Sequence, residues 1–292
     1  MKIMKTSLRL LISVSLVFVL GAGTGVYGAR NLLVTEDEKT IVEVVKKVDP
    51  AVVSVIVSKD VPIMEQFFEE IQVNGNFKIL APQFRQVGTE NQQIGGGTAF
   101  FISHDGMLLT NTHVVTDTAA QYSVVTNTGQ SYPVRILQRV TELDLALLKV
   151  DAPGVSFPVV PISGSVSLDV GQTVLTIGNA LGEFRNTISK GIISGIGRNV
   201  VADTGQFFDR VIQTDAAVNL GGSGGPLLNT SGELIGVVFS TALGAQNISF
   251  AVPLSDVKTL LLDYDENLLR ENNPAYTKEE RRRLLREQRS NR

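Results

Sequence analysis

The chain has 292 residues, 43% of them hydrophobic, with 27 glycines, two histidines and no cysteine. Without cysteine there are no disulfides, thiolate nucleophiles or thiolate metal ligands, and two histidines disfavour a histidine metal site, so we expect no metal or cofactor. The net charge is −3, but residues 1–30 and 278–292 each carry a formal +4, which leaves −11 on residues 31–277. An acidic region of this size argues against nucleic acid as a partner, because basic groups dominate phosphate binding.

Residues 10–29 form an uninterrupted, uncharged and mainly apolar segment between Arg9 and Arg30. A helix of this length rises about 30 Å, the hydrocarbon thickness of a bilayer. Basic residues precede the segment and acidic residues follow it. Residues 1–30 are therefore predicted to form a cytoplasmic N-terminus and a transmembrane anchor, with the remainder outside the cell membrane. Small residues crowd the end of the segment, so a cleaved signal peptide and a secreted protein are the alternative.

The next part of the chain changes from a helical to a strand-like pattern. Apolar residues at helical spacing in 41–48 predict a short helix that ends before Asp49-Pro50, and residues 31–44 are expected to form a linker or the start of this short helix. After residue 50, short β-branched or aromatic runs are separated by Gly, Asn, Asp or Pro, which predicts an all-β sandwich or barrel. The runs are residues 51–57, 97–103, 122–126, 132–137, 145–150, 173–178 and 248–252.

Two segments fall outside this strand pattern. Residues 60–94 contain Phe67-Phe68 and then an Asn/Gln-rich stretch, and they are predicted to form a long loop. The apolar pair would cap an active site, contact another subunit or simply pack locally. A helical pattern returns at residue 254, and residues 263–292 are predicted to form a charged helical or disordered tail.

The run AVNLGGSGGPLL, residues 217–228, places Ser223 between two Gly-Gly pairs. Glycine reaches backbone conformations that other residues resist and lets a substrate chain approach closely, so Ser223 can expose its Oγ and direct its own N–H at an oxyanion. A flexible turn or linker is the structural alternative. The apolar segments on both sides favour a serine nucleophile, because linkers lie between domains.

A serine hydroxyl is a poor nucleophile at neutral pH and needs an adjacent base. His113 follows an apolar run in MLLTNTHVV, whereas His104 stands in the turn sequence SHDG and is expected to be exposed. His113 is therefore the candidate base, although a histidine after a strand also serves purely structural roles.

A histidine base needs an acceptor that fixes its tautomer and stabilises the imidazolium. Asp144 stands directly before the apolar run LALLKV, a position that also suits an ordinary turn aspartate. The chain order His113, Asp144, Ser223 is the order of double-barrel serine proteases and differs from that of subtilisin-like and α/β-hydrolase enzymes. Together, the three residues predict a catalytic triad.

Three blocks, TNTHVV, DLALLKV and QTDAAVNLGGSGGPLLNTSGELIGV, resemble the signature blocks of the HtrA/Deg family of trypsin-like serine proteases. GGGTAFFIS and ISFAVP extend this resemblance over residues 45–262. It implies two six-stranded β-barrels with the active site between them, in a domain that cleaves unfolded or misfolded proteins outside the cytoplasm. It also suggests a homotrimer. A catalytically silent, membrane-tethered binder of unfolded polypeptides is the alternative.

The resemblance also implies roles for single residues. His113 is general base and then acid, Asp144 orients it, and Ser223 forms the acyl-enzyme. Gly221 and Ser223 supply the backbone N–H groups of the oxyanion hole. The implied pocket for the residue before the scissile bond is lined by small or apolar side chains, which predicts cleavage after small aliphatic residues. They are Val218, Ser240, Thr241 and Ala242.

The chain departs from the family pattern in two places. The family usually has Asn before the serine, in a GNSGG run, where this chain has Gly222. The additional glycine raises the conformational freedom of the loop and predicts an oxyanion hole that becomes fully ordered only with substrate or a partner bound. Family members usually carry PDZ domains after the protease, and no such domain fits within residues 263–292.

Overall fold

The computed structural model describes residues 35–73, 77–163, 167–180, 184–202, 205–241 and 247–272. The chain divides into two units, residues 1–46 and 47–292. The anchor predicted at residues 10–29 lies outside the described residues. Within the described ranges, no helix is long and apolar enough to cross a membrane.

Helix α2 (Glu36–Val48) begins with a capping box. The Thr35 N–H donates to Glu38 Oε2 at 2.8 Å, and the Glu38 N–H donates to Thr35 Oγ1 at 3.2 Å. These reciprocal bonds satisfy two amide groups at the start of the helix. The helix ends before the 3-10 turn η1 (Asp49–Ala51), where Pro50 lacks the N–H that would continue it. The sequence pattern predicted this end.

Six antiparallel strands close the first barrel in the order β1-β2-β3-β6-β5-β4. Alternate residues point inward and form an apolar core that includes Val53, Val55 and Phe101. Phe157, from the segment after β6, stacks on Phe101 with ring centroids 4.3 Å apart. The strands are β1 (Val52–Val73), β2 (Phe77–Phe101), β3 (Met107–Thr110), β4 (Gln121–Val125), β5 (Ser131–Val140) and β6 (Leu145–Val150).

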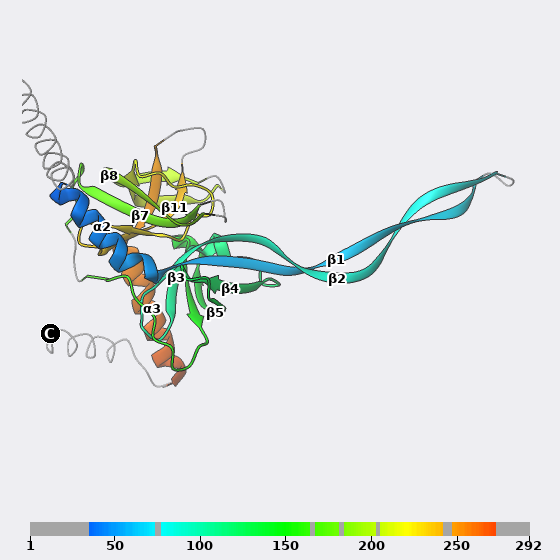
Figure 1. Ribbon diagram of the computed structural model, residues 1–292, viewed down its shortest axis with the longest axis horizontal. Helices are drawn as coiled ribbons and strands as arrows, with labels where there is room; N and C mark the ends of the chain where they lie inside the picture. Colours follow the sequence, from blue (N-terminus) through cyan, green and yellow to red (C-terminus); the bar gives the residue numbers. More distant parts are fainter. Residues whose placement is uncertain are drawn as a thin grey trace, which may run out of the picture. The chain divides into compact units, whose positions relative to one another are not determined.

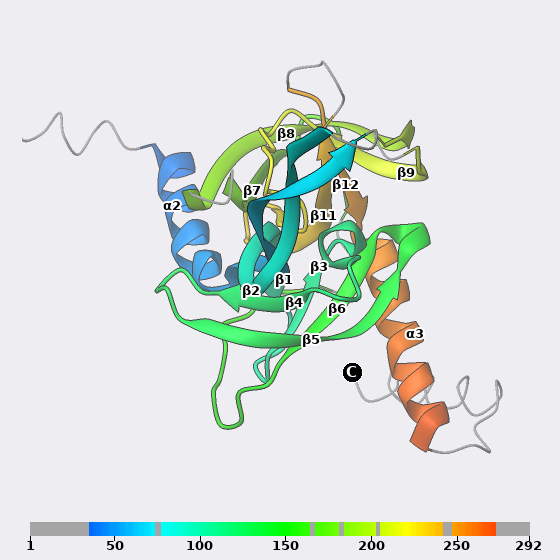
Figure 2. The same ribbon diagram turned by 90° about the vertical axis from the view of Figure 1, so that its right-hand side faces the viewer.

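The second barrel closes in the order β10-β11-β12-β9-β8-β7, and Figure 2 shows both barrels viewed along the β1-β2 hairpin. Helix α3 (Leu254–Asn272) follows β12 directly and buries Leu254, Val257 and Leu260. The prediction of an all-β protein with two six-stranded barrels is confirmed. The strands are β7 (Thr173–Ala180), β8 (Phe184–Val201), β9 (Phe207–Thr214), β10 (Pro226–Leu228), β11 (Leu234–Thr241) and β12 (Ser249–Pro253).

The prediction of a long loop at residues 60–94 is wrong, because this segment belongs to an antiparallel hairpin that extends from the first barrel (Figure 1). Strand β1 pairs with β4 only over residues 54–58, and β2 pairs with β3 only at Phe100 and Phe101. Residues 59–73 and 77–92 therefore pair only with each other. We call this part of the hairpin the arm.

The arm lacks a strand pattern in its sequence because neither of its faces is buried, so nothing requires apolar and polar residues to alternate. Met64, Phe68, Leu80 and Phe84 lie on one face, and each side chain is more than half exposed. Register shifts between Val57 and Ser58 and between Ile63 and Met64 obscure the period further. A two-sided exposed ribbon therefore resembles a loop in the sequence.

Candidate active site

His113 lies on the 3-10 turn η2 (Thr112–Val115), which follows the end of β3. Val114 and Val115 are buried in the core of the first barrel and fix this turn, whereas the His113 side chain is 40% exposed. The apolar neighbours thus hold the backbone while the imidazole reaches the cleft.

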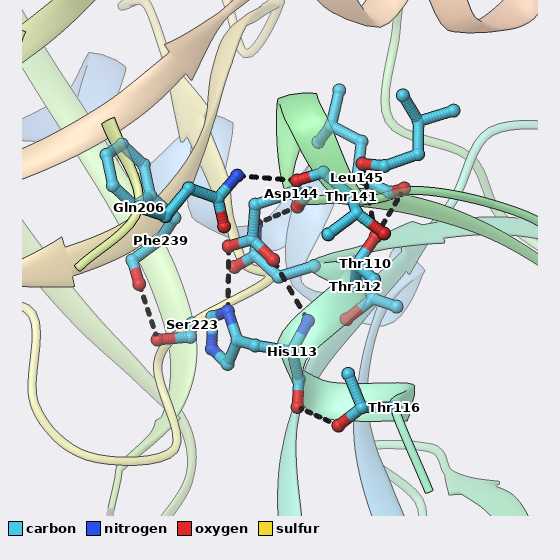
Figure 3. A network of polar contacts seen from close by, with 12 residues as sticks. Thr110, Thr112, His113, Thr116, Thr141, Asp144, Leu145, Gln206, Ser223 and Phe239 are labelled. Carbon is cyan, nitrogen blue, oxygen red and sulfur yellow. Dashed lines mark hydrogen bonds and ion pairs between the residues drawn. The ribbon is translucent and has the colours of Figure 1, made fainter. Parts of the chain in front are cut away.

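Asp144 follows the 3-10 turn η3 (Thr141–Leu143) and lies directly before β6. Its Oδ2 lies 2.7 Å from His113 Nδ1, and its Oδ1 accepts the His113 backbone N–H at 2.9 Å (Figure 3). The carboxylate is 7% exposed. Because an ionised carboxylate only accepts hydrogen bonds, this contact places the imidazole proton on Nδ1 and leaves Nε2 free to act as a base.

Backbone contacts hold the two turns that carry this pair. The Asp144 carbonyl oxygen accepts the Thr112 N–H at 3.2 Å and Asn111 Nδ2 at 2.8 Å. The Thr112 hydroxyl donates to the Leu145 carbonyl oxygen at 2.7 Å. These bonds lie directly beyond the paired residues of β3 and β6 and hold the His113 and Asp144 turns against each other.

Ser223 lies in the loop before β10, and its Oγ donates to the Phe239 carbonyl oxygen at 3.1 Å (Figure 3). Ser223 lines one cavity of about 410 Å³ together with His113 and Asp144. Among the described residues, no hydrogen bond joins the Ser223 hydroxyl to the His113 imidazole. A rotation about the Ser223 Cα–Cβ bond, to another staggered rotamer, would direct Oγ away from Phe239.

The loop before Ser223 forms a tight turn. The Gly222 N–H donates to the Asn219 carbonyl oxygen at 2.8 Å, and Gly221 has a φ of +86°. A positive φ at the third position of a hydrogen-bonded turn is typical of type II and favours glycine. No described residue accepts a hydrogen bond from the N–H of Gly221 or of Ser223. Both groups are available to a ligand.

The cavity beside the serine is lined mainly by apolar groups. Val218 lies in it as the sequence predicted. Phe208 and Phe239, with ring centroids 4.4 Å apart, also line it and were missed, because their strands do not reveal which face points into the cleft. Ser240 and Thr241 belong to β11, but their side chains and the whole of Ala242 lie outside the described residues.

A contact between the barrels lies next to the Asp144 turn. Gln206, from the loop between β8 and β9, donates through Nε2 to the Thr141 carbonyl oxygen, which also accepts the Asp144 N–H. On the first barrel, the Lys59 ammonium beside Asp117 holds the pKa of that carboxyl below its ordinary value. In the part of the chain that the structure describes, no group of three or more His, Cys, Asp or Glu side chains is placed to hold a metal ion.

Residues 97–237 match the family model described as a trypsin-like peptidase domain. The chain is 36% identical over 231 residues to HhoA of Synechocystis sp., named as a serine protease, and the match covers 76% of this chain and 56% of HhoA. It is 34% identical over 252 residues to a DegP-like protein of Brucella suis, named as a periplasmic serine endoprotease, covering 75% of this chain and 48% of that protein. The chain thus spans about half the length of these curated relatives.

A solved structure shares the fold as well. The serine endoprotease from Yersinia pestis superimposes with a TM-score of 0.56 at 28% identity, covering 76% of this chain and 65% of that one. The chain belongs to the HtrA/Deg family of trypsin-like serine proteases. The resemblance stated from the sequence blocks is therefore confirmed.

Within this HtrA/Deg fold, we predict that Asp144→Asn lowers kcat/KM on a peptide ester at neutral pH by about 10⁴-fold without unfolding the protein. An asparagine presents to the imidazole either an amide NH₂ group or an uncharged oxygen. It therefore neither fixes the proton on His113 Nδ1 nor stabilises the imidazolium as a carboxylate does. Kinetics and circular dichroism of the two purified proteins check this. A loss of less than tenfold with the fold intact would remove Asp144 from the mechanism.

Proposed function

We propose that the chain is a serine endopeptidase that acts through an acyl-enzyme on Ser223. The observation that carries the proposal is the arrangement of the His113–Asp144 pair and Ser223 around one cavity, together with the backbone N–H groups of Gly221 and Ser223, which no described residue engages. These are the groups that acyl transfer requires: a nucleophile, an oriented base and donors for the oxyanion.

In the proposed mechanism, the Ser223 hydroxyl leaves the Phe239 carbonyl and gives its proton to His113 Nε2 as Oγ attacks the substrate carbonyl carbon. The N–H groups of Gly221 and Ser223 bind the oxyanion of the tetrahedral intermediate. His113 then donates the proton to the leaving amine, and the peptide bond breaks. Water, deprotonated by His113, hydrolyses the acyl-enzyme, while the Asp144 carboxylate stabilises the imidazolium in both steps.

Degradation of unfolded casein tests the proposal. Wild type should degrade casein, and Ser223→Ala should lose at least about 10³-fold of this activity because the nucleophile is absent. Ser231→Ala is the matched control, since Ser231 lies in an exposed turn, and it should retain full activity.

Equal degradation by wild type and Ser223→Ala contradicts the proposal. If both proteins bind casein and neither cleaves it, the chain is instead a silent binder of unfolded polypeptides. Labelling of wild type by a fluorophosphonate probe, with mass spectrometry to identify the modified residue, shows independently whether Ser223 is activated.

We propose that the enzyme cleaves after small aliphatic residues. Val218 belongs to the cavity wall, and among the described residues the ionisable side chains that line the cavity are those of His113 and Asp144. Apart from this pair, no described residue therefore supplies a cationic or anionic partner there for a charged substrate side chain. Ser240, Thr241 and Ala242 stay assigned to this pocket by family resemblance.

A peptide series that varies only the residue before the scissile bond tests this specificity. Val and Ala should give a kcat/KM at least about tenfold higher than Lys, because a buried, unpaired ammonium is costly. Val218→Asp should narrow or reverse this ratio, whereas Val218→Ala should keep it. Faster cleavage of the Lys peptide by wild type would overturn the assignment.

We further propose that residues 10–29 tether the enzyme to the cell membrane as a single-pass anchor, with the protease domain outside the cytoplasm and three protomers together. Hydrophobicity and flanking charge support the anchor. The periplasmic designation of the Brucella suis relative supports the location. Unfolded or misfolded extracytoplasmic proteins are then its substrates.

The mass and oligomeric state of the protein extracted from membranes test this proposal. A full-length mass, extraction only with detergent and a trimeric complex are expected. A mass lacking the first 20–30 residues, in protein released without detergent, would replace the anchor by a cleaved signal peptide. A monomer across the micromolar range would contradict the trimer.

A further inference from the structure

Thr98 of β2 lies fully buried where the first barrel meets the nucleophile loop, residues 219–225. Its backbone N–H donates to the Ser223 carbonyl oxygen at 2.9 Å. Its hydroxyl donates to the Gly221 carbonyl oxygen at 2.7 Å. A single residue of the first barrel thus holds the carbonyl groups of both residues whose N–H groups are free for an oxyanion.

The Thr98 hydroxyl has a fixed orientation. It accepts the backbone N–H of Asn179, on β7 of the second barrel, at 2.9 Å. A hydroxyl carries one proton, so accepting from Asn179 directs that proton toward Gly221. Thr98, Asn179 and Gly221 therefore form a three-way junction of the first barrel, the second barrel and the loop.

The bond from Thr98 completes the restraint on one peptide group of the loop. The peptide that joins Gly221 to Gly222 is held at its N–H by Asn219 and at its oxygen by Thr98. Two successive glycines leave this segment many backbone conformations, and the Gly221 N–H and the Ser223 N–H lie in the peptide groups on either side of the one that is held. Hydrogen bonds at both ends of the Gly221–Gly222 peptide hold the segment in one backbone conformation.

We propose that Thr98 is a positioning residue for catalysis, whose hydroxyl keeps the N–H groups of Gly221 and Ser223 directed at the oxyanion. This inference rests on the proposed peptidase function. Thr98 does not line the catalytic cavity, and it acts only through the loop. The effect should therefore appear in transition-state stabilisation more than in substrate binding.

Three variants test the proposal. Thr98→Val removes the hydroxyl and keeps the shape, and Thr98→Ser restores the hydroxyl. Thr214→Val is the matched control, because the buried Thr214 hydroxyl likewise donates to a carbonyl (Ile192) and accepts an N–H (Ala216), but away from the loop.

We expect Thr98→Val to lower kcat on a peptide ester about tenfold, less than the 10²–10³-fold lost with an oxyanion donor, and to change KM by less than about twofold. Thr98→Ser should recover kcat to within about threefold of wild type. Thr214→Val should lower the melting temperature about as much as Thr98→Val and keep kcat within about twofold of wild type. An unchanged kcat in Thr98→Val, or an equal loss in Thr214→Val, overturns the proposal.

Hydrogen–deuterium exchange provides a readout that does not depend on activity. Thr98→Val should speed exchange in the peptide that covers residues 217–226, and Thr98→Ser and Thr214→Val should leave it at the wild-type rate. Unchanged exchange in Thr98→Val overturns the proposal even if the wild type proves inactive. An inactive wild type with faster exchange in Thr98→Val overturns the peptidase function alone and leaves the junction in place.

Discussion

The nucleophile loop packs directly against the backbone of both barrels. At the closest contacts, the barrel strands have no room for a side chain. A Cβ at Gly97 of β2 would lie 2.7 Å from Val114 Cγ1 and 3.3 Å from the Ser223 carbonyl oxygen. A Cβ at Gly178 of β7 would lie 2.9 Å from Gly222 Cα. Because Val114 is the residue after His113, the same glycine of β2 allows the approach of the histidine turn and of the serine loop. Glycine at these positions is what lets Ser223 and His113 share one cleft.

The Asp144 turn differs from these glycine positions, because it requires a carboxylate side chain on a backbone conformation that most residues avoid. Asp144 has a φ of +50°, a left-handed conformation that aspartate tolerates better than most residues other than glycine and asparagine. Bonds from Thr112 and Asn111 to its carbonyl oxygen hold this conformation. Its carboxylate accepts both the N–H and the Nδ1 proton of His113, so the imidazole position is determined by backbone contacts of the first barrel. Of the three residues, only Ser223 comes from the second barrel.

The sequence predicted the parts of this protein that depend on local chemistry. The short apolar runs were sufficient for an all-β fold, and the family resemblance added the two six-stranded barrels. Chain order and sequence context paired His113 with Asp144, and the two side chains are in contact. The arm was missed because solvent on both faces removes the alternation that identifies a strand. Phe208 was missed because the direction of a ring into a cleft depends on strand register. Thr98 was missed because its partners are 123 and 81 residues away, and nothing in GGGTAFFIS indicates them.

Gly222, where the family pattern has asparagine, also lies at a position with little space for a side chain. A Cβ there would lie 3.0 Å from the Asn219 carbonyl oxygen and 3.2 Å from Val218 Cγ1, so the turn and the pocket wall already occupy most of the space that a side chain needs. The glycine allows this tight turn but adds conformational freedom to the loop. The order of the loop must then come from outside it, from the Thr98 hydroxyl on one barrel and the Asn179 N–H on the other. In the proposed mechanism, an oxyanion hole held in this way depends on contacts from both barrels, so we expect docking of the barrels to be a condition for catalysis.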